Sequence, residues 1–372
     1  MTRHLSLAKI LVVKLAGIGD LLTALPALEA LRKRYGGAEI TALVTPQTAS
    51  LLRGSRLVDQ VIVLDKYLYD TPYGVLRPRR FAELARLAAR LRHQHFDAAV
   101  LLHHMITWPG VLKYGFLMAA ASAPLRVGLA DGRARFLNLS VRDRGFGAVH
   151  EVEYWLQVVE LLGASNPRPA VRLPLGPEEE AEASERWAGL GLGPADRVVA
   201  IHPGTGNYSP VRRWSPEGFS AVGESLAEDG LIPMVVAGPG EEGLAREIVA
   251  GVRAPSILLQ GVPSLRHLAA ALSRCRLFVG NDSGVMHLAA AAGVPVVAVF
   301  GPSNHRAWGP YDPTGDRSRI VRVDLPCSPC LYRGQSLGLR YGCGDPRCLQ
   351  RVLPAMVVAA ARDLLRQTAA VG

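Results

Sequence analysis

The fold class of this chain is decided by residues 10–20, Ile-Leu-Val-Val-Lys-Leu-Ala-Gly-Ile-Gly-Asp. The apolar, β-branched run at 10–15 predicts a strand buried on both faces, as strands of parallel sheets are. A glycine-rich turn follows and ends at Asp20, and a helical run with Pro26 inside it comes next. A strand, a glycine turn and a helix in this order indicate a doubly wound α/β domain.

The alternation of buried strand and helix recurs along most of the chain, which predicts two doubly wound halves. Predicted strands lie at 10–15, 40–44, 61–64 and 98–102 in the first half, and at 198–202, 232–237, 277–279 and 294–300 in the second. A Pro- and Gly-containing stretch between Leu162 and Asp196 is the predicted linker. We therefore expect domains over 1–175 and 176–350, and a closing helix in 351–372 that packs on the first domain.

The composition is that of a folded protein. The chain has 372 residues, of which 49% are hydrophobic and 20% charged, which excludes a disordered chain and a single small module. The net charge of +10 comes from 42 Lys and Arg, only five of them Lys. Arg suits phosphate and carboxylate recognition, but a coding bias explains the surplus equally well. Aromatic residues amount to only 6% and the Arg residues are scattered, which argues against nucleic-acid binding.

Nothing in the sequence predicts membrane insertion or export. No run approaches the ~20 apolar residues of a membrane span, and residues 1–9 lack a hydrophobic signal segment. We expect a cytoplasmic protein, whose basic surface permits peripheral contact with the inner face of the cytoplasmic membrane.

The turn after the first strand carries the first candidate site. Gly17 and Gly19 form a G-x-G, but Leu22 stands where a dinucleotide fingerprint has its third glycine, which argues against a nicotinamide cofactor. Asp20 places a carboxylate at the carboxyl end of a strand, where doubly wound folds bind ligands. A helix N-cap is the alternative reading of Asp20.

The second half opens with a similar turn at 202–206, His-Pro-Gly-Thr-Gly. Such a turn lets backbone N–H groups approach phosphate oxygens, Thr205 adds a hydroxyl, and Arg212 can balance the charge of a diphosphate. The turn lacks the G-K-[ST] of a Walker loop, which argues against an NTPase.

A third turn lies at 280–287, Gly-Asn-Asp-Ser-Gly-Val-Met-His. Ser283 can cap the helix that follows while Gly284 exposes the first helical amides. Asp282 precedes the cap and His287 lies one helical turn onward. These groups predict an anion site, although a lone His here is usually structural.

Four of the five cysteines crowd into one loop, at Cys327, Cys330, Cys343 and Cys348. Disulfides are disfavoured in a reducing compartment, so packed or transiently oxidised thiols are the favoured reading. A structural zinc ion is the less favoured alternative, because the x4 spacing of the second pair is loose for a zinc ribbon. We expect the loop to be structural and to fold against the C-terminal domain.

Over nearly its whole length the chain resembles glycosyltransferase family nine, typified by the ADP-heptose:lipopolysaccharide heptosyltransferases. The resemblance is carried by residues 10–28, by His-Pro-Gly-Thr at 202–205 with Arg-Arg-Trp-Ser-Pro-Glu at 212–217, by Asn-Asp-Ser-Gly-Val-Met-His at 281–287, and by Phe-Gly-Pro-Ser at 300–303. The Cys-Ser-Pro-Cys segment at 327–330 is similar to one found chiefly in members that add the second heptose.

The resemblance implies a GT-B architecture, in which two Rossmann-like doubly wound domains face an interdomain cleft. It implies an inverting, metal-independent enzyme with no catalytic cofactor that moves a heptose from ADP-heptose to an acidic, lipid-linked inner-core saccharide. Asp20 is then the candidate general base, consistent with the need to remove a proton from the acceptor hydroxyl.

The remaining site residues are assigned by motif. The implied substrate-binding residues are Lys14, Gly19, Thr205, Arg212, Asp282, Ser283, Gly284, His287 and Glu241, with Glu242 an equal alternative to Glu241 near the ribose. The family often has Lys where Arg212 stands. Two other readings stay open, namely a family-nine transferase with another nucleotide sugar and acceptor, and a nucleotide-sugar binding protein without catalysis.

Overall fold

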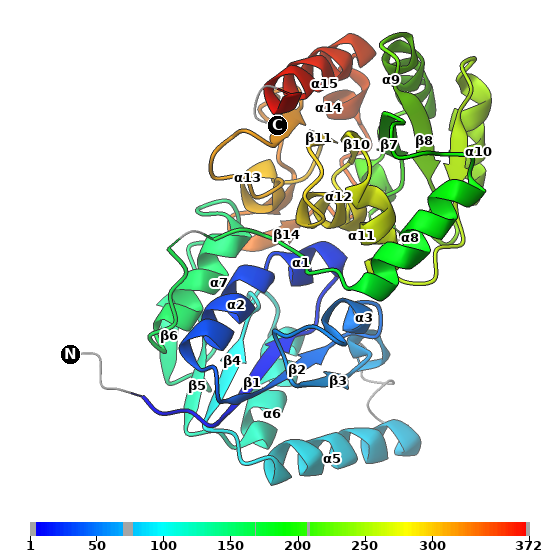
Figure 1. Ribbon diagram of the computed structural model, residues 1–372. Coiled ribbons are helices and arrows are strands. Elements are labelled where there is room, and N and C mark those ends of the chain that lie inside the picture. Colours follow the sequence, from blue (N-terminus) through cyan, green and yellow to red (C-terminus); the bar gives the residue numbers. More distant parts are fainter. Residues whose placement is uncertain (1–4, 70–76, 168, 207–208, 370–372) are drawn as a thin grey trace. The chain divides into compact units, whose positions relative to one another are not determined.

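The computed structural model describes residues 5–69, 77–167, 169–206 and 209–369. They form two compact units (Figure 1). The first unit contains Met1–Gly145 and Glu151–Pro169, and the second contains Phe146–His150 and Ala170–Gly372. The chain therefore leaves the first unit for five residues before it returns at Glu151. The division at 169/170 lies six residues before the boundary expected from the sequence.

The first unit is a six-stranded parallel sheet in the order β3-β2-β1-β4-β5-β6. Its elements are β1 (Lys9–Lys14), α1 (Ile18–Leu22), α2 (Leu25–Arg34), β2 (Glu39–Val44), α3 (Ala49–Leu52), β3 (Gln60–Val63), the 3₁₀ helix η1 (Lys66–Tyr69), α5 (Pro78–His93), β4 (Ala98–Leu101), α6 (Trp108–Ala121), β5 (Leu125–Ala130), β6 (Leu139–Arg142) and α7 (Glu151–Glu160).

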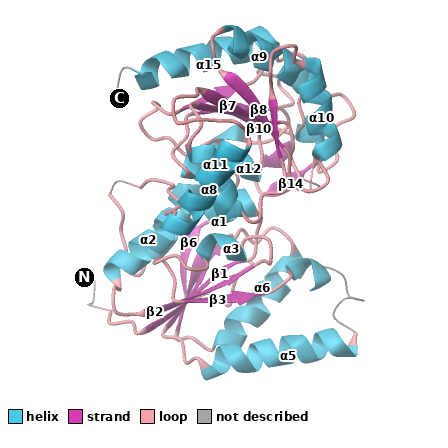
Figure 2. Cartoon of the chain, turned by 45° about the vertical axis from the view of Figure 1, so that its right-hand side comes forward, coloured by secondary structure: helices cyan, strands magenta, loops and turns pink. Residues whose placement is uncertain are grey.

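Successive side chains of β1 point to opposite faces of this sheet. Leu11 and Val13 pack with residues of α5 and α6, while Lys14 lies on the face of α7, over the ring of Trp155. Helices α5 and α6 pack side by side (Figure 2), as do α2 and α7 (Figure 1). Because both faces are covered, the interior of β1 and all of β4 are apolar.

The second unit repeats this plan with the order β12-β11-β10-β7-β8-β9. Its elements are α8 (Pro177–Gly189), β7 (Val198–His202), the 3₁₀ helix η2 (Pro210–Arg212), α9 (Pro216–Glu228), β8 (Ile232–Val236), α10 (Glu242–Gly251), β9 (Ile257–Leu259), α11 (Leu265–Ser273), β10 (Leu277–Asn281), α12 (Gly284–Ala291), β11 (Val296–Val299), α13 (His305–Trp308), β12 (Ser318–Val321), the hairpin β13 (Leu331–Arg333) and β14 (Ser336–Gly338), α14 (Arg347–Gln350) and α15 (Pro354–Ala369).

The doubly wound fold predicted for both halves is confirmed. Helices α9, α10 and α15 cover one face of the second sheet, and α8, α11 and α12 cover the other. Serine side chains cap α9, α11 and α12 at Ser215, Ser264 and Ser283, as exposed N–H groups at helix starts require. The capping role expected for Ser283 is thus confirmed.

Two sequence expectations differ from the structure. The closing helix α15 packs in the second unit, on α9 and β12, because Val357, Ala361 and Leu364 are buried in the core of that unit. The expectation that it packs on the first domain is therefore corrected. The helical run around Pro26 is two helices, α1 and α2, with the proline in the first turn of α2, where its missing N–H is harmless.

Candidate active site

Both sheets reverse their strand order beside their first strand. In the first unit β1 lies between β2 and β4, and in the second β7 lies between β8 and β10. The carboxyl end of the strands at such a switch point is where open α/β sheets bind ligands. The charged side chains singled out from the sequence lie at this edge in each unit, because they stand at the end of β1 or in the segments that follow β1, β7, β8 and β10.

Asp20 occupies the third residue of α1, in the first turn after β1. Its Oδ2 accepts a hydrogen bond from the Gly17 backbone N–H at 3.3 Å, and its side chain is half-buried. Gly17, not Asp20, is the N-cap residue, which corrects the alternative reading of Asp20. Gly19 is buried inside the same short helix. The turn thus presents a carboxylate at the switch point of the first sheet.

Lys14 ends β1 and is only 2% exposed. Its Nζ lies 3.9 Å from the centroid of the Trp155 ring, a distance at which a cation is attracted to an indole face. Burial lowers the pKa of Lys14, and the carboxylates of Asp20 and Glu151 counteract that lowering. Lys14 is therefore a buried amine held beside Asp20.

A buried network that the sequence analysis did not predict completes this edge. His104 Nδ1 lies 2.7 Å from Asp143 Oδ2, and its Nε2 lies 3.0 Å from Glu151 Oε1. Burial alone would lower the pKa of His104, but the two carboxylates outweigh it and raise the pKa to about 9. His104 is therefore an imidazolium between two carboxylates at neutral pH.

This network holds together parts that are distant in sequence. His104 follows β4, Asp143 follows β6, and Glu151 begins α7. Asp143 and Glu151 also stand on either side of Phe146–His150, the segment that belongs to the second unit. The signal in the sequence is a pair of histidines directly after a buried strand, but nothing local indicates their partners.

In the second unit Glu241 lies against the turn that ends β7. Its Oε1 accepts a hydrogen bond from the Gly206 N–H at 2.9 Å, and its Oε2 lies 3.3 Å from His202 Nε2. Burial would raise the pKa of Glu241, but His202, the Gly206 N–H and Arg213 together lower it to about 2. A Cβ on Gly204 would overlap this carboxylate, so the close approach requires glycine at that position.

The structure separates the two glutamates that the sequence left as alternatives. Glu241 is the N-cap residue of α10, is 7% exposed and points at the glycine turn. Glu242 is the first helical residue and is less buried. Glu241 is therefore the acid positioned at the switch point.

Arg212 connects the two glycine turns. Its Nη1 donates to Asp282 Oδ2 at 3.1 Å, and its Nη2 donates to the Thr205 backbone oxygen at 3.2 Å. The Thr205 hydroxyl lies 3.3 Å from Arg213 Nε. The positive charges of two guanidinium groups are thus balanced by the carboxylates of Asp282 and Glu241. A diphosphate bound here would therefore depend on backbone N–H groups as well as on Arg side chains.

The start of α12 supplies such groups. Ser283 Oγ accepts from the Met286 N–H at 3.2 Å, and Gly284 begins the helix. His287 is 5% exposed on the same helix. The preceding residue Asn281, which the sequence analysis did not select, accepts from the Trp214 N–H and donates to the Pro203 oxygen. Asn281 therefore fixes the turn after β7 against β10.

The cysteine loop is anchored on the Phe-Gly-Pro-Ser segment. The backbone N–H groups of Cys330 and Leu331 donate to the Pro302 oxygen, both at 2.9 Å, and Leu331 is 1% exposed. Burial first, and then the neighbouring thiols, raise the pKa of Cys330 to about 11. Within the described residues, no group of three or more His, Cys, Asp or Glu side chains is arranged to hold a metal ion.

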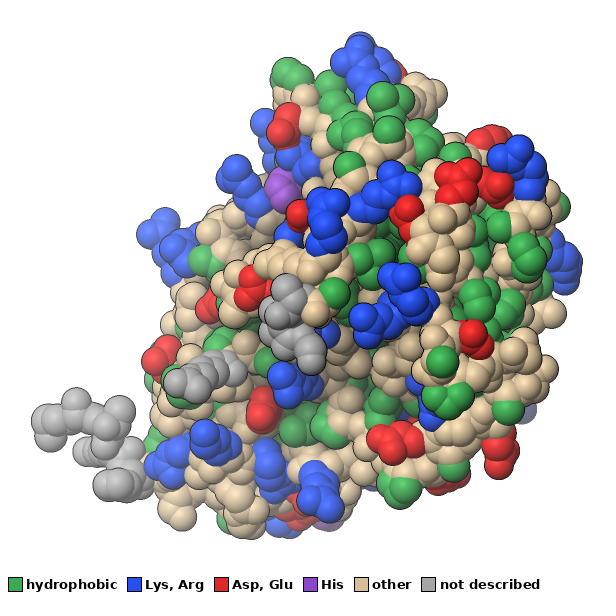
Figure 3. Space-filling model, turned by 45° about the horizontal axis from the view of Figure 1, so that its top comes forward, with side chains coloured by type: hydrophobic (Ala, Val, Ile, Leu, Met, Phe, Trp, Pro, Cys, Tyr) green, Lys and Arg blue, Asp and Glu red, His purple; other side chains and the backbone are tan. Residues whose placement is uncertain are grey.

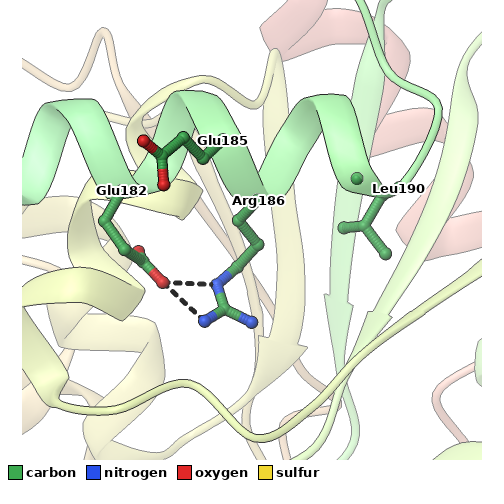
Figure 4. Close-up of a pocket in the computed structure, with 5 residues that line it drawn as sticks. Glu182, Glu185, Arg186 and Leu190 are labelled. Atoms are coloured by element: carbon green, nitrogen blue, oxygen red, sulfur yellow. Dashed lines mark hydrogen bonds and ion pairs between the residues drawn. The ribbon is translucent and has the colours of Figure 1, made fainter.

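A hollow on α8 is lined by Glu182, Glu185, Arg186, Gly189 and Leu190 (Figure 4). Arg186 Nε donates to Glu182 one helical turn earlier at 2.9 Å. None of the site residues selected above lines it, and an ion pair on one helix face is an ordinary surface feature. We therefore assign it no role.

Comparison with known proteins identifies the family. The family model of glycosyltransferase family 9 (heptosyltransferase) matches residues 84–340. The chain belongs to this family. The expectation of a glycosyltransferase, drawn from the motifs, is thereby confirmed.

Curated relatives of this family 9 chain include heptosyltransferases of several bacteria. Lipooligosaccharide heptosyltransferase 2 of Campylobacter jejuni is 26% identical over 46% of the chain and 52% of its own length. The chain thus matches about half the length of that relative. Lipopolysaccharide heptosyltransferase 2 of Salmonella typhimurium is 25% identical over 85% of the chain and 88% of its own length.

Solved structures show the same fold. A family 9 glycosyltransferase from Veillonella parvula has a TM-score of 0.79 at 24% identity, covering 98% of this chain and 99% of that one. E. coli heptosyltransferase WaaC with ADP has a TM-score of 0.72 at 20% identity, covering 96% and 99%. The GT-B architecture is confirmed in its two Rossmann-like domains.

Proposed function

We propose that this chain transfers a heptose from ADP-heptose to the inner core of lipopolysaccharide, with inversion at the anomeric carbon. The observation that carries the proposal is the family match, combined with a charged cluster at the switch point of each sheet. Curated relatives are named lipopolysaccharide heptosyltransferases, and one structural neighbour is described with ADP. These names support heptose and ADP as the sugar and nucleotide.

The first unit takes the acceptor in this proposal. An acceptor hydroxyl that attacks an anomeric carbon must lose its proton, and Asp20 is the carboxylate at the switch point that can receive it. Lys14 lies close enough to Asp20 for the two side chains to interact electrostatically. The acceptor is an acidic, lipid-linked saccharide.

The second unit takes the donor. The first amides of α12 and the guanidinium of Arg212 balance the charge that grows on the leaving diphosphate. The carboxylate of Glu241, ionised down to about pH 2, accepts hydrogen bonds from sugar hydroxyls. Thr205, Asp282 and His287 complete the donor site.

The proposed setting is the inner face of the cytoplasmic membrane. No helix in the described part of the chain is long and apolar enough to cross a bilayer. On the face that Figure 3 shows, Lys and Arg side chains are interspersed with acidic and apolar ones, which does not favour nucleic acid as a partner. We propose peripheral contact with the membrane that holds the acceptor.

The donor is tested with a panel of nucleotide sugars in a thermal-stability assay. A ligand at ~100 times its Kd adds roughly 2.7 kcal/mol to the free energy of unfolding. ADP-heptose should raise the melting temperature most, and ADP release should need the acceptor. A larger effect of another nucleotide sugar would favour a family 9 transferase with a different donor, and binding without turnover would favour a binding protein.

We further propose that transfer needs no metal ion. The three turns lack the carboxylate clusters that hold a Mg²⁺-diphosphate. Transfer should continue in EDTA. If the chelator abolishes transfer without unfolding the protein, and Mg²⁺ or Mn²⁺ restores it, this part of the proposal fails.

A further inference from the structure

Helix α6 is apolar on two opposite faces. Val111, Leu117 and Met118 are buried in the core of the first unit. Trp108, Leu112 and Phe116, spaced one helical turn apart, remain 65%, 72% and 44% exposed. Amphipathic surface helices carry polar residues on the outer face, so a second apolar stripe indicates an interaction surface.

The neighbouring helix α5 is strongly basic. It carries Arg79, Arg80, Arg86, Arg90 and Arg92, follows Arg77, and holds a single acidic residue, Glu83. Most of these guanidinium side chains are exposed. Phe81, in the first turn of α5, is 65% exposed. An exposed apolar stripe therefore lies on the helix that packs beside an Arg-rich one (Figure 1).

The topology places this surface at the edge that carries the candidate base. Helix α6 follows the parallel strand β4, and α5 precedes that strand. Both helices therefore begin at the carboxyl edge of the sheet. Trp108 and Phe81 lie in the first turns of these helices, at the edge where Asp20 follows β1.

We propose that the Trp108–Leu112–Phe116 stripe and the arginines of α5 together dock on the surface of an anionic lipid bilayer. Aromatic and Leu side chains enter the boundary between headgroups and acyl chains, while guanidinium groups bind lipid phosphates. Arg carries its charge at the end of an apolar stem and so suits this boundary. Charge complementarity selects an anionic bilayer over a neutral apolar partner.

The inference rests on the proposed function only for its setting, in which a lipid-anchored acceptor lies in the membrane. Docking would bring the edge that holds Asp20 to the headgroup layer. An enzyme that acts on such an acceptor then meets it by diffusion in two dimensions.

The test is co-sedimentation of the full-length chain with phosphatidylcholine vesicles, with and without phosphatidylglycerol. We expect binding that requires phosphatidylglycerol and weakens with salt. Two variants test the surface: the triple variant Trp108→Ser, Leu112→Ser, Phe116→Ser and the double variant Arg86→Glu, Arg90→Glu. Each should bind the vesicles more weakly than the wild type by a factor on the order of ten or more. Equal binding to both vesicle types, or binding unchanged in these variants, would overturn the proposal.

Matched controls come from exposed residues of the second unit. Leu353→Ser with Met356→Ser is the apolar control, and Arg351→Glu with Arg366→Glu is the charge control. Both should bind like the wild type. If the triple variant fails to fold, Trp108→Phe replaces it, because Phe keeps the apolar contact but removes the lipid-dependent shift of Trp108 fluorescence.

Two further readouts separate the outcomes. ADP affinity by calorimetry should be unchanged in every docking variant, since the donor residues are untouched. A wild-type dimer that the triple variant converts to monomer would assign the stripe to contact between two copies and overturn the proposal. Vesicle binding without heptose transfer would support the docking surface and contradict the proposed function. Heptose transfer without vesicle binding would support the proposed function and contradict the docking surface.

Discussion

Asp20 is the residue on which the proposed reaction depends. Asp20→Asn keeps the hydrogen bond from Gly17 possible but removes the basic oxygen, so the fold and donor affinity should be retained. Turnover at saturating acceptor should fall by on the order of 10²- to 10⁴-fold, the usual contribution of a general base. The turnover is measured as steady-state ADP release. The control is Asp65→Asn, a carboxylate that follows β3 at the same edge of the sheet. Near-normal turnover of Asp20→Asn would remove Asp20 from this role.

Arg212 acts through both its charge and its pairing with Asp282. Arg212→Ala removes a charged donor and leaves the Asp282 carboxylate, 4% exposed, without this ion pair. ADP should therefore bind about 10- to 100-fold more weakly, as the loss of ~1.5–3 kcal/mol implies. The double variant Arg212→Ala, Asp282→Asn should recover part of the loss, because the unbalanced charge is gone. Unchanged affinity of Arg212→Ala by calorimetry would place the diphosphate elsewhere.

Between elements, the His104 network joins the ends of β4 and β6 to the start of α7. The folded state raises the pKa of His104 from its ordinary 6.5 to about 9, so protonation contributes stability fully below pH 6.5. That contribution is lost as the pH rises through 9. The free energy of unfolding in urea should fall across this interval by no more than about 3 kcal/mol.

The variant His104→Gln should show a flatter pH dependence over the same interval. His93→Gln, at the exposed end of α5, is the control and should keep the wild-type slope. An identical slope in His104→Gln would show that another group titrates there. His104→Ala should cost about 3–5 kcal/mol at neutral pH, since it leaves two buried carboxylates without their cation.

The cysteine loop is the second element-scale feature with a test. With packed thiols, Cys327→Ser at the exposed position should change stability by less than about 0.5 kcal/mol. Cys348→Ser buries a hydroxyl and should cost about 1–3 kcal/mol. Thermal melts and elemental analysis measure these outcomes. Similar losses for all four cysteines together with one zinc per chain would instead assign a metal bridge.

Strands of this protein were predictable where they are buried on both faces. All eight predicted strands exist, because β1, β4, β7, β10 and their neighbours are continuous apolar runs. Strands β5, β6, β9 and β12 and the hairpin strands β13 and β14 were missed. Arg126 and Gly128 interrupt the apolar pattern of β5, and β6, β9 and β12 are short strands at the sheet edges.

Site residues were also predictable where they lie near the end of a buried strand. Residues at the end of a buried strand or in the turn after it, such as Lys14, Asp20 and Asp282, could be selected because parallel strands align their carboxyl ends. The choice of Glu241 over Glu242 needed the local path of the chain around Gly206. Asp143 and Glu151 lie 39 and 47 residues from His104, so no local pattern indicates that contact.

At the scale of the whole molecule, the proposed reaction requires groups from both doubly wound units. The first offers a carboxylate at its switch point, and the second offers helix amides, an arginine and a buried acid at its own. Neither set alone can both activate an acceptor and stabilise a leaving diphosphate. We therefore propose that the two units together join a heptose to a saccharide acceptor.

The most direct test is the product itself. The purified chain is incubated with ADP-heptose and an inner-core acceptor that retains its lipid anchor, and the acceptor is examined by mass spectrometry and NMR. We expect one added heptose, linked with the anomeric configuration opposite to that of the donor, and almost no product with Asp20→Asn. The proposed reaction is wrong if ADP-heptose leaves the acceptor unmodified while another nucleotide sugar modifies it. It is also wrong if the product retains the anomeric configuration of the donor.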